Sequence, residues 1–289
     1  AKALVDLAAL VTEDFSSVQT ITSKAADVAS VLGAITAVGN AAINVTITGA
    51  IDAAVAGAIS NVTTGKVTAT IKPDTADQIL AGLANANANT DALAVTVNGP
   101  DADAADLTGI YAKTSSKVKV DAATVTAADF DKFEDVYVIN KNKFSSLGDE
   151  NITITAAALP ANNISSAQAD IVAKATSKVV TATIAGESAA SVVTNLKNAN
   201  AKDAFTIKLT NVPTSAKDLL TLAGKTSIAV DASDIKVAIT GTVAEVNKLL
   251  VANVTLSKNV GGNIDAVFNL TGTVKAADAN YIALNTAGV

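Results

Sequence analysis

The sequence predicts an α/β repeat protein, in which strand–short helix repeats of about 25 residues stack as a solenoid-like array. The segment VTATIKPDTADQILAGLANANA (67–88) recurs 113 residues later as VTATIAGESAASVVTNLKNANA (180–201), with half of its 22 positions identical. A helix-like pattern and a strand-like pattern also alternate along most of the chain. Because one strand and one helix cannot bury their apolar faces alone, successive repeats are expected to pack on one another.

Helices are expected where Ser, Thr or Asp precedes an Ala that a large apolar residue follows three positions later. The first side chain can cap the helix, and Ala is the best helix former. In residues 74–83, Ala76, Ile79, Leu80 and Leu83 then form one apolar stripe. The matching segments are 23–32, 51–59, 74–83, 101–110, 126–133, 165–172, 187–196, 214–223, 242–250 and 274–282.

Strands are expected between these helices, where Val, Ile and Thr alternate with other residues at a period of two. Many of the segments end in Gly, Asn or Pro, which predicts a tight turn before the next helix. The expected strands are residues 42–49, 66–71, 93–99, 117–120, 136–139, 151–155, 179–186, 205–212, 235–241 and 266–272.

Four successive helices recur as a larger repeat, because Val55 and Ile171 are 116 residues apart and Ile79 and Val192 are 113 apart. This predicts three regions. Residues 1–49 hold an N-terminal repeat and an assembly segment, residues 50–163 a first four-repeat block with an insert at 134–163, and residues 164–289 a second block and a C-terminal assembly segment. The alternative is two duplicated α+β or β-rich domains of about 113 residues each.

The composition argues against most enzyme classes. The chain contains no His, Cys, Met or Trp, and every basic residue is Lys. Pairs of a nucleophile with a histidine base, and zinc sites built from His and Cys, are therefore excluded. We predict that the protein is not an enzyme, with no catalytic residue and no cofactor.

Charge and hydropathy exclude two classes of partner. The net charge is −6 and no Lys-rich tract is present, whereas nucleic-acid binding needs clustered positive charge. The apolar stretch 28–45 is interrupted by Gly, Asn and Ser, so no membrane span is expected.

Two groups of residues are candidate binding sites. Asp101, Asp103 and Asp106 form an acidic cluster that is a weak calcium candidate, since carboxylates are the ligands that calcium prefers. The sixth and twelfth positions of an EF-hand loop starting at Asp101 would be Asp106 and Ala112 instead of Gly and Glu, so helix capping is the alternative. The stretch 136–151 departs most from the repeat and carries Tyr137 and Phe144, the candidates for binding a partner.

The segments DTADQILAGL, ESAASVVTNL and SKAADVASVL, each followed by a Val/Thr/Ile-rich strand, resemble the repeats of large secreted bacterial cell-surface proteins of the cyanobacterial type. The resemblance implies export and a role in a surface layer, sheath, filament or adhesin.

The predicted function is that of a non-enzymatic, extracellular structural protein whose partners are copies of itself. Exposed strand edges at the two ends of the array would provide polymerisation surfaces. The terminal segments 1–15 and 274–289 are the regions expected to dock on neighbouring copies. The alternative is an adhesin or fibre module that recognises surface glycans or another cell surface.

Overall fold

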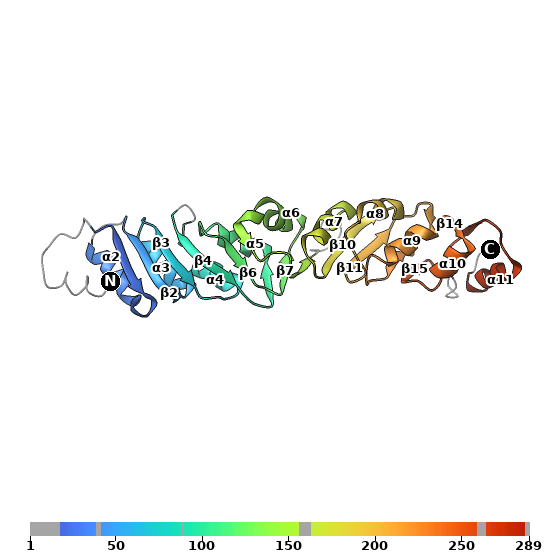
Figure 1. Ribbon diagram of the computed structural model, residues 1–289. Helices are drawn as coiled ribbons and strands as arrows, with labels where there is room; N and C mark the ends of the chain where they lie inside the picture. Colours follow the sequence, from blue (N-terminus) through green and yellow to red (C-terminus); the bar gives the residue numbers. More distant parts are fainter. Residues whose placement is uncertain (1–17, 39–41, 88–89, 156–162, 259–263, 287–289) are drawn as a thin grey trace. The chain divides into compact units, whose positions relative to one another are not determined.

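The computed structural model describes residues 18–38, 42–87, 90–155, 163–258 and 264–286. The predicted assembly segment 1–15 lies outside the described residues. The protein is α/β, with parallel sheets and strands that alternate with helices, as the sequence predicts (Figure 1). The chain divides into two compact units. Unit 1 is Ala1–Ala127 with Asp131–Glu150, and unit 2 is Ala128–Phe130 with Asn151–Val289. The three-region division at residues 49 and 163 stays a prediction.

Unit 1 is built on a parallel sheet. Its strands, in spatial order, are β1 (Thr20–Lys24), β2 (Asn44–Ile51), β3 (Val67–Ile71), β4 (Ala92–Val97), β6 (Val118–Val120) and β8 (Phe144–Ser145). Two short strands, β5 (Asp101–Asp103) and β7 (Thr124–Ala127), pair in parallel with each other. The helices are η1 (Ala25–Asp27), α2 (Ala29–Val38), α3 (Ala53–Val62), α4 (Ala76–Gly82), α5 (Ala104–Tyr111), α6 (Phe130–Glu134), η2 (Asp135–Ile139) and η3 (Lys141–Lys143).

The register of this sheet follows the repeat period. Neighbouring strands pair residues that are 20 to 26 positions apart in the chain, as in Thr20↔Asn44, Ile51↔Ile71, Thr68↔Ala92, Val95↔Val118 and Val118↔Phe144. Consecutive parallel strands need a crossover, which in a βαβ arrangement is a helix. Each period of about 25 residues therefore supplies one strand to the sheet and, in most repeats, one helix beside it.

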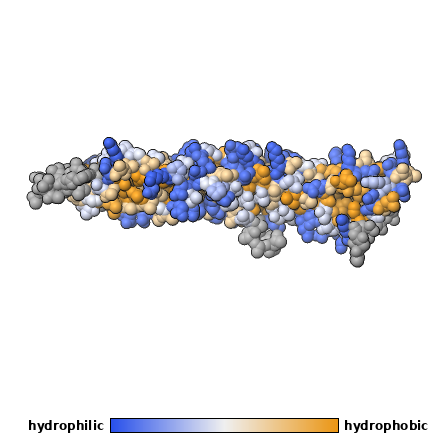
Figure 2. Space-filling model, turned by 90° about the horizontal axis from the view of Figure 1, so that it is seen from below, coloured by the Kyte–Doolittle hydropathy of each residue, from blue (hydrophilic) through white to orange (hydrophobic). Residues whose placement is uncertain are grey.

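The core of unit 1 lies between the sheet and the helices. On β3, Val67, Ala69 and Ile71 are buried and alternate with more exposed residues. Ile79 of α4 and Leu83 just beyond it are fully buried, as the apolar stripe predicts. Hydrophilic and hydrophobic residues are mixed over the surface outside this core (Figure 2).

Helices α3 and α4 approach each other through glycine. A Cβ atom added to Gly57 would lie 2.1 Å from the carbonyl oxygen of Gly82, and one added to Gly82 would lie 2.6 Å from the Cβ of Ala53. Because the atoms that each added Cβ would meet are backbone or Cβ atoms, no side-chain rotation could relieve the clash. The close packing of α3 on α4 therefore depends on glycine at both positions.

Unit 2 repeats the same plan. One set of parallel strands runs β9 (Asn151–Ile154), β10 (Val180–Glu187), β11 (Ala204–Leu209), β13 (Val230–Ala232) and β15 (Val254–Leu256), and a second runs β12 (Thr214–Ser215), β14 (Ile239–Thr242) and β16 (Phe268–Thr271). The helices are α7 (Ser166–Ala175), α8 (Ala189–Asn195), α9 (Ala216–Ala223), α10 (Val243–Leu249) and α11 (Ala276–Asn285). Neighbouring helices in this series, such as α7 and α8, lie side by side (Figure 1).

Four helices of unit 2 begin with the predicted hydroxyl cap. The side chains of Ser165, Ser188, Ser215 and Thr242 each accept a hydrogen bond from the backbone N–H three residues later. Ser165 and Thr242 also form capping boxes, with Gln168 and Glu245. These bonds satisfy N–H groups that the first turn of a helix leaves without a partner.

One predicted strand is wrong. Residues 136–139 were expected to be extended, but they belong to the π-helix η2, which follows α6 directly. The ring of Tyr137 stacks on that of Phe133, four residues earlier, with centroids 4.8 Å apart. Side chains four residues apart meet on a helix and not on a strand, so this buried contact favours helical backbone over the β propensity of the segment.

Candidate functional site

The acidic cluster lies where β5 leads into α5. Asp101 and Asp103 are on β5, and Asp106 is in the first turn of α5. Oδ1 of Asp103 accepts a hydrogen bond from the backbone N–H of Ala105 at 2.7 Å, so this residue caps the helix. Burial, and then the charges of Asp103 and Asp77, raise the pKa of Asp106. Within the described residues, no group of three Asp, Glu, His or Cys side chains is arranged to hold a metal ion. Calcium binding here stays a prediction.

The aromatic candidates of the insert face the interior of unit 1. Tyr137 is 5% exposed and Phe144 is 4% exposed. The ring of Phe144 meets that of Tyr111 edge to face, with centroids 5.7 Å apart. These two side chains therefore pack in the interior of unit 1, and a role in binding a partner stays a prediction. The exposed apolar residues of the insert are Val138 and Ile139.

Tyr137 also satisfies a buried carboxylate. Its hydroxyl donates a hydrogen bond to Oε1 of Glu150, a residue that is 3% exposed. The backbone N–H groups of Gly148 and Asp149 donate to the same carboxylate, at 2.9 to 3.0 Å. Burial and then the charge of Glu150 raise the pKa of the Tyr137 hydroxyl far above its usual range, so it stays a donor at all physiological pH values. The shared carboxylate of Glu150 therefore links the turn that follows β8 to η2.

Replacing Tyr137 with phenylalanine is expected to lower the free energy of unfolding by about 1–3 kcal/mol, because a buried hydrogen bond to a charged group is lost while the ring contacts remain. Urea unfolding followed by circular dichroism measures this change. Tyr281→Phe is the matched control, since that side chain is 43% exposed. Equal stability of the two variants would contradict the assigned role of the hydroxyl.

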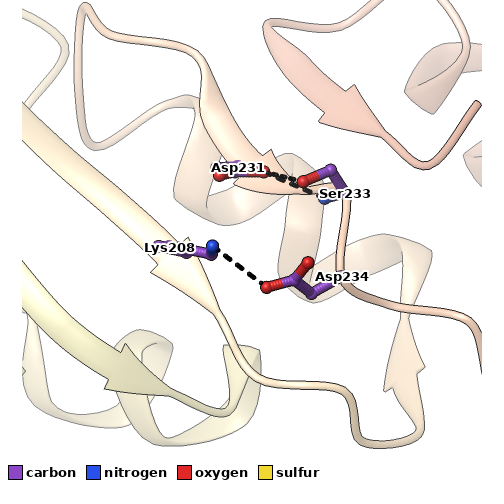
Figure 3. Close-up of polar contacts among 4 residues, drawn as sticks. All are labelled: Lys208, Asp231, Ser233 and Asp234. Carbon is purple, nitrogen blue, oxygen red and sulfur yellow. Dashed lines mark hydrogen bonds and ion pairs between the residues drawn. The ribbon is translucent and has the colours of Figure 1, made fainter.

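A polar hollow lies on unit 2, where β11 and β13 end. It has a volume of about 510 Å³ and is lined by Gly186, Lys208, Leu209, Thr210, Asn211, Asp234 and Lys236. Nζ of Lys208, on β11, lies 3.1 Å from Oδ2 of Asp234, in the loop that follows β13 (Figure 3). The hydrogen bond to Asp234 raises the pKa of Lys208. The ammonium, carboxylate, amide and hydroxyl groups of the hollow can hydrogen-bond a hydroxylated ligand such as a sugar.

Asp231 holds the loop beside this hollow. Its Oδ1 accepts hydrogen bonds from the backbone N–H of Ser233 at 3.0 Å and from the Ser233 hydroxyl at 2.6 Å (Figure 3). These bonds lower the pKa of Asp231, the hydroxyl contributing most. Asp231 and Lys208 are register partners on neighbouring strands, so the cluster links two successive repeats.

Two further buried carboxylates lie at corresponding turns between a helix and the next strand. Asp91 and Asp203 are each 1% exposed, and they are 112 residues apart. Oδ1 of Asp91 accepts a hydrogen bond from the backbone N–H of Val67, on the preceding strand, at 2.9 Å. Its Oδ2 accepts from the N–H of Asn87 and from the hydroxyl of Ser60, both at 2.9 Å. The carboxylate therefore joins its own turn to the previous repeat.

Asp203 makes the corresponding contacts in unit 2. Its Oδ1 accepts from the backbone N–H of Val180 at 3.0 Å, and its Oδ2 accepts from the N–H and the side-chain amide of Asn200 at 2.9 and 3.1 Å. A carboxylate that accepts several such bonds replaces water as the partner of N–H groups that would otherwise be buried without one.

The next turn in each unit carries threonine in place of aspartate. Thr114 Oγ1 donates to the carbonyl oxygen of Leu93 at 2.8 Å, and Thr226 Oγ1 donates to that of Phe205 at 2.8 Å. Sequence analysis missed these residues, although the signal was present. The recurring NANA segments are followed by Asp91 and Asp203, and Lys-Thr-Ser recurs at 113–115 and 225–227.

Comparisons with protein-family models, with curated proteins and with solved structures return no match to the chain. In the part of the chain that the structure describes, no helix has both the length and the apolar content that crossing a bilayer requires.

Proposed function

We propose that this protein is a non-enzymatic, extracellular structural protein that assembles with copies of itself into a surface layer, sheath or filament. The repeats of the two units would form a solenoid-like array that continues from copy to copy. The resemblance of the DTADQILAGL-type segments to secreted bacterial surface repeats supports the location at the cell surface.

The observation that carries the proposal is that the parallel sheets end in strands whose outer edge is not paired. Among the described residues, β1 is paired only with β2, and β16 is paired only with β14. The outer edge of a terminal strand presents backbone N–H and C=O groups that another chain can pair with. Because β1 and β16 are different strands, a contact between them would be head-to-tail, and such contacts give open chains where the rotation does not close.

Sedimentation velocity of the full chain over a range of concentrations tests this proposal. Association is expected to appear as a weight-average mass that rises continuously with concentration, because each added copy leaves a new open end. A constant monomer mass at every concentration would contradict the proposal.

The second candidate function is a glycan-binding adhesin or fibre module. The polar hollow around Lys208, Asn211 and Asp234 favours it, since sugars are bound through dense hydrogen bonding to such groups. A glycan array probed with the full chain separates the two functions. Retention of specific glycans, lost when Asn211 is replaced by alanine, would support the adhesin, and absence of any retention would count against it.

A further inference from the structure

Lysine side chains gather along one edge of unit 2. Its strands run parallel, so each of the helices between them ends at the edge where the next strand begins. Successive helices α7 to α10 each carry a lysine in the last turn or just beyond it, namely Lys174, Lys197, Lys225 and Lys248. Two more lysines precede β10 and β11 at the same edge, Lys178 and Lys202. We call these six residues the lysine ladder.

Contacts between successive turns make this edge continuous. Nζ of Lys225 donates a hydrogen bond to the carbonyl oxygen of Lys197 at 2.9 Å, which joins the ends of α9 and α8. The side-chain amide of Asn198, after α8, donates to Oδ2 of Asp170, on α7, at 2.8 Å. The amide of Asn253, after α10, donates to the carbonyl oxygen of Ser227, after α9, at 3.3 Å. The ladder is therefore one surface, although its lysines are spread along the chain.

Little negative charge offsets the ladder. The side chains of Lys174, Lys197, Lys202 and Lys248 are exposed, and none of them makes a salt bridge to another described residue. Of the carboxylates at this edge, that of Asp203 is buried, and that of Asp170 is bonded to Asn198. The remaining carboxylates of residues 163–258 lie where strands end and helices begin, on Glu187, Asp218, Asp231, Asp234 and Glu245.

Helix stability accounts for part of this pattern. Cations stabilise the C-terminal end of a helix, but the effect falls off within the last turn. It does not account for Lys178 and Lys202, which lie in the loops beyond α7 and α8. Like charges gathered on one edge repel each other, and a bound anion would relieve that repulsion.

We propose that the lysine ladder binds an acidic polysaccharide, a linear polymer that carries carboxylate or sulfate groups along its length. A row of ammonium groups that recurs from helix to helix suits a ligand whose negative charges also recur. Ser177 and Ser227 are exposed in the same turns, and their hydroxyl groups can hydrogen-bond sugar rings.

A nucleic acid fits this surface less well. Proteins bind single strands by stacking bases on exposed aromatic rings, in addition to charge. Within residues 163–258 the aromatic residue is Phe205, and it is fully buried. The polysaccharide is a partner of another kind than the second copy proposed above, so either proposal can hold without the other.

Binding of the full chain to immobilised polymers, measured by biolayer interferometry, tests this inference. Polygalacturonate supplies carboxylates, dextran sulfate supplies sulfates, and neutral dextran is the blank. We expect binding to the acidic polymers and none to dextran. The binding is expected to weaken as salt is added, because exposed charges are screened.

Two triple variants separate the ladder from net charge. Lys174→Gln with Lys202→Gln and Lys248→Gln is expected to weaken binding by about tenfold or more, since several exposed charge contacts are lost together. The matched control replaces three exposed lysines of unit 2 that lie where strands end and helices begin, Lys217→Gln, Lys258→Gln and Lys275→Gln. It has the same net charge as the ladder variant and is expected to bind nearly as the unmodified chain does. Equal melting temperatures show that both variants are folded.

Stronger binding to one acidic polysaccharide than to the other would support the proposal and identify the anionic group. Equal loss of binding in the ladder variant and the control would overturn it, because net charge alone would then be responsible. Failure to bind both acidic polymers would also overturn it, as would tighter binding to single-stranded DNA than to either of them. Sedimentation velocity of the same variants without polymer reports self-assembly separately.

Discussion

Replacing Asp203 with alanine is expected to lower the free energy of unfolding by about 1–3 kcal/mol, because the buried backbone N–H of Val180 loses its acceptor. The part-buried N–H of Asn200 also loses its acceptor, but water can replace it there. This is a large part of the stability of an ordinary domain. Chemical denaturation followed by circular dichroism measures the change.

Asp203→Asn tests how much of this loss of stability comes from the charge and hydrogen bonds of the carboxylate, and not from the packing of the side chain. The amide keeps the size of the side chain and one acceptor oxygen, but its NH₂ group would face either the N–H of Val180 or that of Asn200. We therefore expect a loss of stability nearly as large as with alanine. Asp234→Ala is the control, since its side chain is 56% exposed and its ion pair with Lys208 lies at the surface. Such pairs contribute little to the free energy of unfolding. An Asp203 variant as stable as this control would contradict the account of the turn.

Replacing Gly57 with alanine is expected to destabilise the protein by about 1–3 kcal/mol, although alanine is the better helix former by about 1 kcal/mol. The new Cβ would lie 2.1 Å from the carbonyl oxygen of Gly82, so α3 and α4 must move apart and their buried contacts with the sheet must shift. Thermal unfolding of the variant measures the net effect.

Gly224→Ala is the matched control for this substitution. Gly224 follows α9 with a φ of −85°, and the nearest atom to an added Cβ is 3.5 Å away. Alanine there meets no obstacle and reduces the freedom of the unfolded chain, so stability is expected to stay equal or rise slightly. A Gly57 variant that melts at or above the temperature of the Gly224 variant would show that the two helices do not need their close approach.

The fold class could be predicted because its signals are local. Alternating Val, Ile and Thr identified strands such as β3 and β10, and hydroxyl residues before Ala identified the caps of α7 to α10. The short strand β1, TITSK, was missed because its Lys and Ser weaken the pattern. The segment at 136–139 was expected to be a strand, but four consecutive apolar residues fit a helix and a strand equally well. The stacking of Tyr137 on Phe133 favours the helical backbone that the structure shows.

The polar residues of the turns were harder to predict. An aspartate is most often exposed, so a sequence alone favours a solvated role for Asp91 and Asp203. Their burial depends on donors from distant segments, such as Val67 for Asp91, which only the folded chain brings within reach. For the same reason the aromatic residues of the insert looked available for binding, whereas the fold turns Tyr137 and Phe144 inward.

Electron microscopy of the full chain, at concentrations where its mass has begun to rise, tests the proposed self-assembly most directly. The account predicts long, unbranched filaments, or sheets made from them. Particles that stay single, or that close into small rings of fixed size, would contradict open head-to-tail assembly.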